Sequence, residues 1–591
     1  MLDHRGTGHS LPNTRKLTII AQDPAVRSRD NIVTAEVDVP AEELRPGPRG
    51  YRVAVVDYDV STNCLYEPAA FKPLRDGNYP DPFQVDRNRR RRRPKGYDGK
   101  LLTDPRFHAQ NVYAIVMRTL ARFEFALGRR VAWGCYGHQI HIAPHAFAEP
   151  NAFYSREDRG LFFGYFVGKD GEPVFTCLAH DVVAHEATHA ILDGLRSRYL
   201  EPSSPDQAAF HEGFADIVSL LSVFSIKDVV AALLDIGTGR GGKLIDRKFL
   251  TRTALGSSVL FGLADQMGNE LSGIRGEALR RSVELKPGFP YMSMPGFTEE
   301  HQRGELIVAA MMNAFLDIWL ERLKKVGFIA KGKRDRSIVV EEGARVAEHL
   351  LTMAIRAIDY CPPTDVDFAD YLSALLTVDR EVVPDDSKYG YRGALLRNFA
   401  GYDIHPAKGA DADGTWKRMP NPGDLVYSRT RFDSLLRDKE EVFRFIWENR
   451  AALNVDGDGY IEVESVRQSI RIGPDGFTLR ETIAEYVQIL TLTANELRAV
   501  GITPPDDLPG WRQVRLFGGG ILVFDEYGQV KYHIAHHINL TEDDIRRQND
   551  RLDHLWRSGF FEAPVDAKSR FSRLHLARAT QRRRGDGKGK P

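Results

Sequence analysis

Apolar residues recur at helical spacing along much of the chain. Between residues 108 and 127 they lie three and four positions apart among polar neighbours, at Val112, Ile115, Val116, Leu120, Phe123 and Phe125. This spacing places them on one face of a helix. Residues 205–235, 302–326 and 340–359 predict further long helices.

Shorter runs rich in β-branched and aromatic residues predict strands. They lie at residues 17–20, 51–58, 131–133, 140–142, 514–517 and 521–524. Residues 402–424 are rich in Gly, Pro and Asp and predict a linker. Helices and strands both contribute, so the sequence predicts an α+β protein of several parts.

The composition is that of an ordinary soluble protein. Among 591 residues, 42% are hydrophobic and 27% charged, and Lys+Arg and Asp+Glu both number 81. A balanced charge gives no general field for nucleic acid or an anionic membrane, so we expect neither as a partner. Four scattered cysteines favour free thiols in a reducing compartment. The first residues lack the apolar core of a secretion signal, so we expect a cytoplasmic protein; the alternative is secretion by a non-classical route.

Two other patterns have plain interpretations. The basic run at residues 89–95 lacks interleaved aromatic residues and predicts a solvated loop. His138, His141 and His145 lie close together in sequence but without helical pairing. We expect them to be ordinary strand and loop residues and not a second metal site.

The strongest chemical pattern is His-Glu-x-x-His at residues 185–189. In a helix, His185 and His189 stand one turn apart on the same face, where both can bind one Zn²⁺. Glu186 could then take a proton from a water molecule at the metal. Ala184, Ala187 and neighbouring helix-forming residues favour the helix.

A third zinc ligand is expected downstream, at residues 211–217. Glu212 and Asp216 are four residues apart and share a helix face. Glu212 can complete the zinc site, and Asp216 can accept the outer N–H of a ligating histidine. His211 is an alternative ligand; we prefer Glu212, because it forms a pair with Asp216.

These motifs resemble those of the gluzincin metallopeptidases, and within them the thermolysin-like group. The resemblance covers residues from about 100 to about 405. It implies a zincin-like catalytic unit, with a mixed sheet and zinc helix above and a helical subdomain below. The sequence Asn-Ala-Phe-Tyr at residues 151–154 is similar to the family's edge strand, which implies Asn151 and Ala152 as substrate contacts.

Other site residues are implied by the same resemblance. Tyr199 and His301 are similar to the family's two oxyanion donors, and Arg280 to an arginine that binds the substrate carbonyl. The chain departs from the family where a calcium-binding carboxylate is expected, because that residue is Val223. We therefore expect Asp181, which matches the partner carboxylate, to be a helix N-cap.

The sequence thus predicts a β-rich N-terminal region (1–99), a metallopeptidase unit (100–405), a linker (406–429), an α+β region (430–576) and a disordered basic tail (577–591). The expected function is hydrolysis of peptide bonds in a peptide or protein substrate. One zinc ion per chain would be bound, Glu186 would be the general base, and the action would be that of an endopeptidase. The alternative is a catalytically silent zincin-fold protein that binds or scaffolds other proteins.

Overall fold

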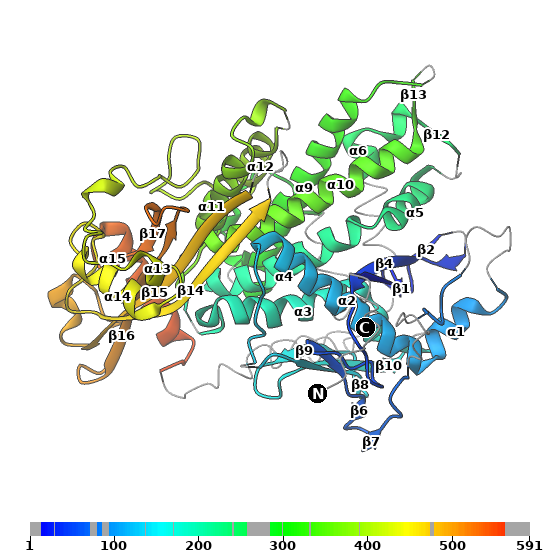
Figure 1. Cartoon of the computed structure of the whole chain (residues 1–591), viewed down its shortest axis with the longest axis horizontal. Coiled ribbons are helices and arrows are strands. Elements are labelled where there is room, and N and C mark those ends of the chain that lie inside the picture. The colour runs from blue at the N-terminus through cyan, green and yellow to red at the C-terminus, as the bar shows by residue number, and fades with distance from the viewer. Residues whose placement is uncertain are drawn as a thin grey trace, which may run out of the picture.

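The computed structural model describes residues 14–561, except residues 29, 71–79, 86–93, 136, 169–170, 202, 239–241, 257–283, 298, 330–331, 389 and 473–477. It is a mixed α+β structure (Figure 1). Arg280, most of the basic run and the C-terminal tail lie outside the described residues, so the predictions made for them stay predictions.

The sheet nearest the site is mixed. β5 (Val53–Val55), β8 (Ile140–Phe147) and β10 (Gly160–Val167) run parallel to one another, while β9 (Ala152–Ser155) and β11 (Pro173–Phe175) pair antiparallel with β10. Residues 1–99 are β-rich as predicted in their described part. They are not a separate unit, however, because β5 belongs to this sheet.

The other N-terminal strands form small pairs. β1 (Thr14–Ile20) pairs with β4 (Thr34–Pro40), β2 (Arg27–Ser28) with β3 (Asn31–Ile32), and β6 (Tyr58–Asp59) with β7 (Cys64–Leu65). The strand predicted at residues 131–133 is absent. This segment instead bonds to Arg52, whose guanidinium donates to Val131 O and whose carbonyl accepts from the indole Nε1 of Trp133.

Helices make up most of the central part. They are α1 (Tyr97–Thr103), α2 (Pro105–Leu127), α3 (His180–Leu195), α4 (Pro205–Phe224), α5 (Lys227–Thr238), α6 (Arg252–Leu255), α9 (Glu300–Lys325), α10 (Arg336–Ala357), α11 (Phe368–Val382) and α12 (Tyr391–Ala400). β12 (Leu244–Asp246) pairs with β13 (Lys333–Asp335) beside them. The predicted helices at 108–127, 302–326 and 340–359 are confirmed as α2, α9 and α10.

The helix predicted at 205–235 is two helices. α4 ends at Phe224, where the N–H of Ser225 bonds to Leu221 O and the hydroxyl of Ser225 bonds to Ser222 O. α5 then leaves at 80° to α4. Among the described residues, no single helix is long and apolar enough to cross a membrane; only this bent pair meets that test together.

The C-terminal part is built on an antiparallel sheet. β14 (Tyr460–Ile472), β15 (Thr478–Thr493), β16 (Gln513–Phe524) and β17 (Val530–His536) pair in that order, with α13 (Phe432–Leu435), α14 (Lys439–Glu448) and α15 (Glu542–Arg557) around them. The two strands predicted at 514–517 and 521–524 are parts of one continuous strand, β16. Gly519 joins them at a φ of +135°, where a Cβ would lie 2.4 Å from Tyr486 O.

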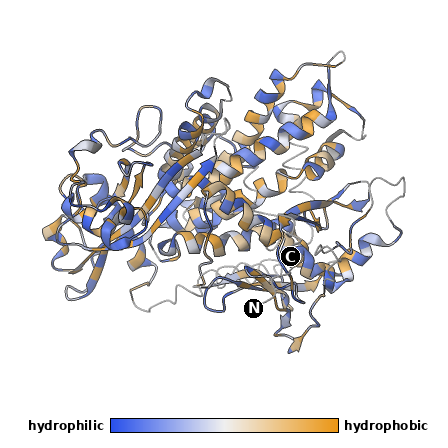
Figure 2. Ribbon diagram, in the orientation of Figure 1, coloured by the Kyte–Doolittle hydropathy of each residue, from blue (hydrophilic) through white to orange (hydrophobic). Residues whose placement is uncertain are grey.

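One hydrophobic core runs from Leu17 to Ile404 and includes side chains of β15, β16 and β17. Apolar residues gather along the helices at the centre of the molecule (Figure 2). The predicted linker is irregular but packed: Trp416 is buried, and its indole N–H donates to Tyr360 O. Side chains of the C-terminal sheet thus join this core, while two further cores lie wholly within residues 425–552.

Candidate metal centre

The His-Glu-x-x-His segment lies in the middle of α3, a deeply buried helix. Almost every residue from His180 to Leu195 is buried, polar side chains included. His185 and His189 stand one turn apart, with ring centroids separated by 4.3 Å. The predicted helix and the shared face are confirmed.

The start of α3 differs from the prediction. The N-cap is Ala179, and Asp181 lies in the first turn. Burial of its carboxyl group raises the pKa of Asp181 to about 6. The expectation that Asp181 is the N-cap is therefore corrected by two residues.

Glu212 on α4 faces both histidines. His185 Nε2 lies 3.5 Å from Glu212 Oε2, and His189 Nε2 lies 3.6 Å from Glu212 Oε1. One donor atom from each of these three buried residues falls within 4.8 Å of the others, so the group could hold a metal ion. Tetrahedral ligands with bonds of about 2.0–2.1 Å to Zn²⁺ lie about 3.3 Å apart, close to the observed separations.

The outer ring nitrogens are held by other side chains. His185 Nδ1 donates to Asp216 Oδ1 at 2.8 Å, as predicted. His189 Nδ1 and His211 Nδ1 share a hydrogen bond of 2.8 Å. His211 therefore orients His189 from behind, and Glu212, the preferred choice, is the third donor.

Two glycines bring α9 against α4. A Cβ on Gly213 would lie 2.8 Å from Gly304 O, and a Cβ on Gly304 would lie 2.8 Å from Ala209 O. This close approach places His301 beside the cluster, with its Nε2 3.7 Å from Glu212 Oε2. The N-cap residue of α9, Glu299, accepts a hydrogen bond from His301 Nδ1 at 2.7 Å. The predicted position of His301 at the site is confirmed.

Glu186 points toward β9. Its Oε2 accepts the backbone N–H of Tyr154 at 3.0 Å. Asp193, two turns further along α3, accepts bonds from the Tyr154 hydroxyl and from Arg156, so β9 is fixed to α3 at two levels. Burial raises the pKa of the Glu186 carboxyl to about 8, against the opposing effect of His185.

The carboxylates around His185 favour a positive charge on its ring. Burial disfavours its protonated form, but the carboxylates of Asp216 and Glu212 outweigh burial and raise its pKa to about 10. A positive charge at this position is therefore strongly favoured by the surrounding carboxylates. A metal cation bound to the ring would meet the same field.

The remaining predicted residues have mixed outcomes. Asn151 and Ala152 stand at the start of β9 and are buried, with Asn151 Oδ1 accepting the N–H of Ala152. Tyr199 is not brought to the cluster. Its buried hydroxyl donates to Pro362 O at 2.7 Å and lies near Cys361 and Arg196, so the expectation that it faces the site is corrected.

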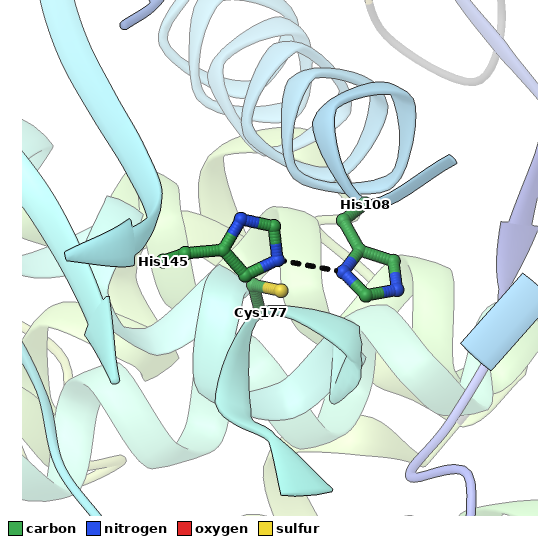
Figure 3. Close-up of side chains that lie close together, drawn as sticks. All are labelled: His108, His145 and Cys177. Carbon is green, nitrogen blue, oxygen red and sulfur yellow. Dashed lines mark hydrogen bonds between the residues drawn. The ribbon is translucent and has the colours of Figure 1, made fainter. Parts of the chain in front are cut away.

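A second group of potential ligands was missed by sequence reasoning. His108 on α2, His145 on β8 and Cys177 just before α3 are all buried and offer donor atoms within 4.8 Å of one another (Figure 3). His145 thus lies in this buried group, whereas His138 and His141 are exposed. The three residues are more than 30 positions apart and share no motif, so only the fold reveals them. Burial, followed by repulsion from His145, lowers the pKa of His108 to about 3.

A search against protein-family models gives no match, and no curated protein matches the sequence. The functional argument therefore depends on the arrangement of the described side chains.

Proposed function

We propose that the protein is a zinc-dependent peptidase, as the resemblance to the thermolysin-like gluzincins implies. One observation carries the proposal. The inner nitrogens of His185 and His189 face Glu212 at 3.5 and 3.6 Å, while each outer nitrogen is held by a hydrogen bond. Two imidazoles and one carboxylate form the donor set of catalytic zinc sites, and the bond to Asp216 fixes His185 in the tautomer that binds metal.

Zn²⁺ bound by these residues would supply Lewis acidity, which polarises a carbonyl and makes water more acidic. The protein would supply the proton transfers. Glu186 is one residue from His185 and is anchored by the N–H of Tyr154. It would accept the proton of the attacking water and return it to the leaving amine.

His301 would stabilise the oxygen that becomes negative in the transition state. Glu299 accepts from its Nδ1 and so orients the ring, with Nε2 on the side of Glu212. An N–H at Nε2 would be the donor. Asn151 and Ala152 begin the strand that would align substrate backbone, the role that the resemblance implies.

The burial of the site favours a second candidate, a catalytically silent zincin-fold protein that binds other proteins. The side chain of Glu186 is 0% exposed. A protein that never turns over a substrate has no need of an accessible base.

The Glu186→Gln variant separates the two candidates. We expect it to keep its zinc and to lose peptide hydrolysis by about 10²–10⁴-fold, because the amide cannot accept the proton. Glu201→Gln, at a half-exposed position between α3 and α4, is the matched control and should cleave like wild type. If wild type and Glu186→Gln hydrolysed a broad peptide library at equal rates, the role of Glu186 as general base would be refuted. Zinc-loaded wild type that cleaves no member of the library would support the silent protein.

A further inference from the structure

We propose that His108, His145 and Cys177 form a second metal site, which binds one Zn²⁺ and has a structural role. The site does not rest on the proposed peptidase function. It lies at the junction of α2, β8 and the turn that leads into α3, and all three side chains are buried. The sulfur of Cys177 points at the two rings (Figure 3).

The hydrogen bonds behind the rings fix where their protons are. His108 Nε2 lies 3.0 Å from the carbonyl oxygen of Leu102, which can only accept, so this nitrogen carries a hydrogen. His145 Nδ1 lies 2.7 Å from the carboxylate of Asp57, which also takes a backbone bond from His145. Both outer nitrogens are therefore donors, as the outer nitrogens of metal-bound histidines are.

The inner nitrogens of the two rings face each other. His108 Nδ1 and His145 Nε2 are 2.8 Å apart. In two neutral rings with hydrogens on the outer nitrogens, both inner atoms present lone pairs, which repel at this distance. A cation between them turns this repulsion into two bonds.

Cys177 decides which cation fits. A shared proton needs only the two nitrogens, whereas a thiol within 4.8 Å of both supplies a third ligand for a metal. Nitrogen and sulfur donors with no carboxylate among them favour Zn²⁺ over Mg²⁺ or Ca²⁺. On binding, the thiol proton leaves to solvent and the thiolate bonds the metal.

The expected geometry departs slightly from the structure. Two nitrogens bound to one zinc ion lie about 3.3 Å apart, so the rings would separate by about 0.5 Å on binding. Such a bond set would tie α2 and β8 to the turn three residues before the start of α3. The role we assign is to fix the entry of the helix that carries His185 and His189.

Cobalt substitution tests the site through its sulfur ligand. The full chain is produced with Co²⁺ as the only added transition metal, so that a buried site fills during folding. We expect a sulfur-to-cobalt charge-transfer band in the near ultraviolet from wild type. The His185→Ala/His189→Ala variant should keep this band, because its lost ligands include no sulfur. That result would hold even if the protein proved not to be a peptidase.

The band is assigned with a pair of cysteine variants. Cys177→Ala should lose the band and about one bound metal ion per chain, whereas Cys135→Ala, another buried cysteine outside the group, should keep both. If Cys177→Ala fails to fold, X-ray absorption of zinc-loaded wild type decides, and a sulfur neighbour at about 2.3 Å is expected. A wild-type protein without the band and without a sulfur neighbour would overturn the proposal, as would a band that persists in Cys177→Ala. Two rings that share only a proton would give the first of these results.

Discussion

At the scale of single residues, the candidate site is defined by which side of each ring faces which partner. His185 and His189 direct their inner nitrogens at Glu212, and Asp216 and His211 take the outer ones. The His-Glu-x-x-His spacing and the Glu212–Asp216 pair were sufficient to predict most of this. His211 could not be assigned from sequence, because its ring lies one position from Glu212 and either could have faced the histidines.

Asp216 provides a test of the outer hydrogen bonds. The Asp216→Asn variant should weaken zinc binding by about 10–100-fold, because it removes the carboxylate that orients His185 and raises its basicity. Competition with a chromogenic chelator measures the change. Asp553→Asn, at a half-exposed position of α15, is the control and should bind zinc like wild type. An unchanged zinc affinity of Asp216→Asn would show that Asp216 does not contribute to the metal site.

His301 should affect turnover and leave the metal in place. We expect His301→Gln to retain zinc and to lower kcat by about 10²–10³-fold, because a donor to the developing oxyanion is lost. Steady-state kinetics with a fluorogenic peptide, together with the zinc content of the same sample, would show this. A rise in KM with unchanged kcat would instead assign His301 to substrate binding.

At the scale of elements, close contacts between helices and strands set the site. Hydrophobic spacing predicted α2, α9 and α10, but it could not predict that α4 and α9 cross at Gly213 and Gly304. A lone glycine within a helical pattern gives no indication of which helix it will contact. For the same reason, the sequence did not predict that β16 continues through Gly519. The glycines there indicated a break between two strands.

The crossing of α4 and α9 can be tested with one methyl group. A Cβ on Gly213 would lie 2.7 Å from the Ile307 side chain and 2.8 Å from Gly304 O. Gly213→Ala should therefore lower the free energy of unfolding by about 1–3 kcal/mol and, by moving α9, also reduce activity. Urea denaturation measures the first effect.

The control for this substitution is Gly99→Ala in α1. A Cβ there meets nothing within 4 Å, so the variant should be as stable as wild type or more so. If Gly213→Ala were equally neutral, the two helices would not be in the close contact described.

At the scale of the whole molecule, buried charges join the C-terminal sheet to the helical part. Asp359, after α10, accepts from Arg129 at the end of α2 and pairs with Arg471 on β14. Arg471 also pairs with Glu481 on β15. The sequence predicted separate parts because composition changes near residue 402, and it could not show that charges 112 residues apart pair inside the protein.

Asp359→Asn should be strongly destabilising. Although burial opposes ionisation, Arg129 and Arg471 hold the pKa of this carboxyl well below its usual range. Losing the charge leaves two arginines buried without it, which should lower the free energy of unfolding by about 3–5 kcal/mol at pH 7. Urea denaturation of both proteins measures the difference.

The same pair of proteins gives a pH test. Because the folded pKa is depressed, the stability from Asp359 is present above the unfolded pKa of about 4 and is lost as the pH falls toward the folded value. The stability difference between wild type and Asp359→Asn should therefore shrink as the pH is lowered below about 4. A difference that stays constant into acid would show that charge is not its cause.

The central claim is that His185, His189 and Glu212 hold one metal ion, and anomalous X-ray diffraction from zinc-loaded crystals tests it most directly. Data collected on the two sides of the zinc absorption edge should give a difference peak bounded by the inner nitrogens of the two histidines and the Glu212 carboxylate. A folded, zinc-loaded protein with no peak at that position would contradict the account.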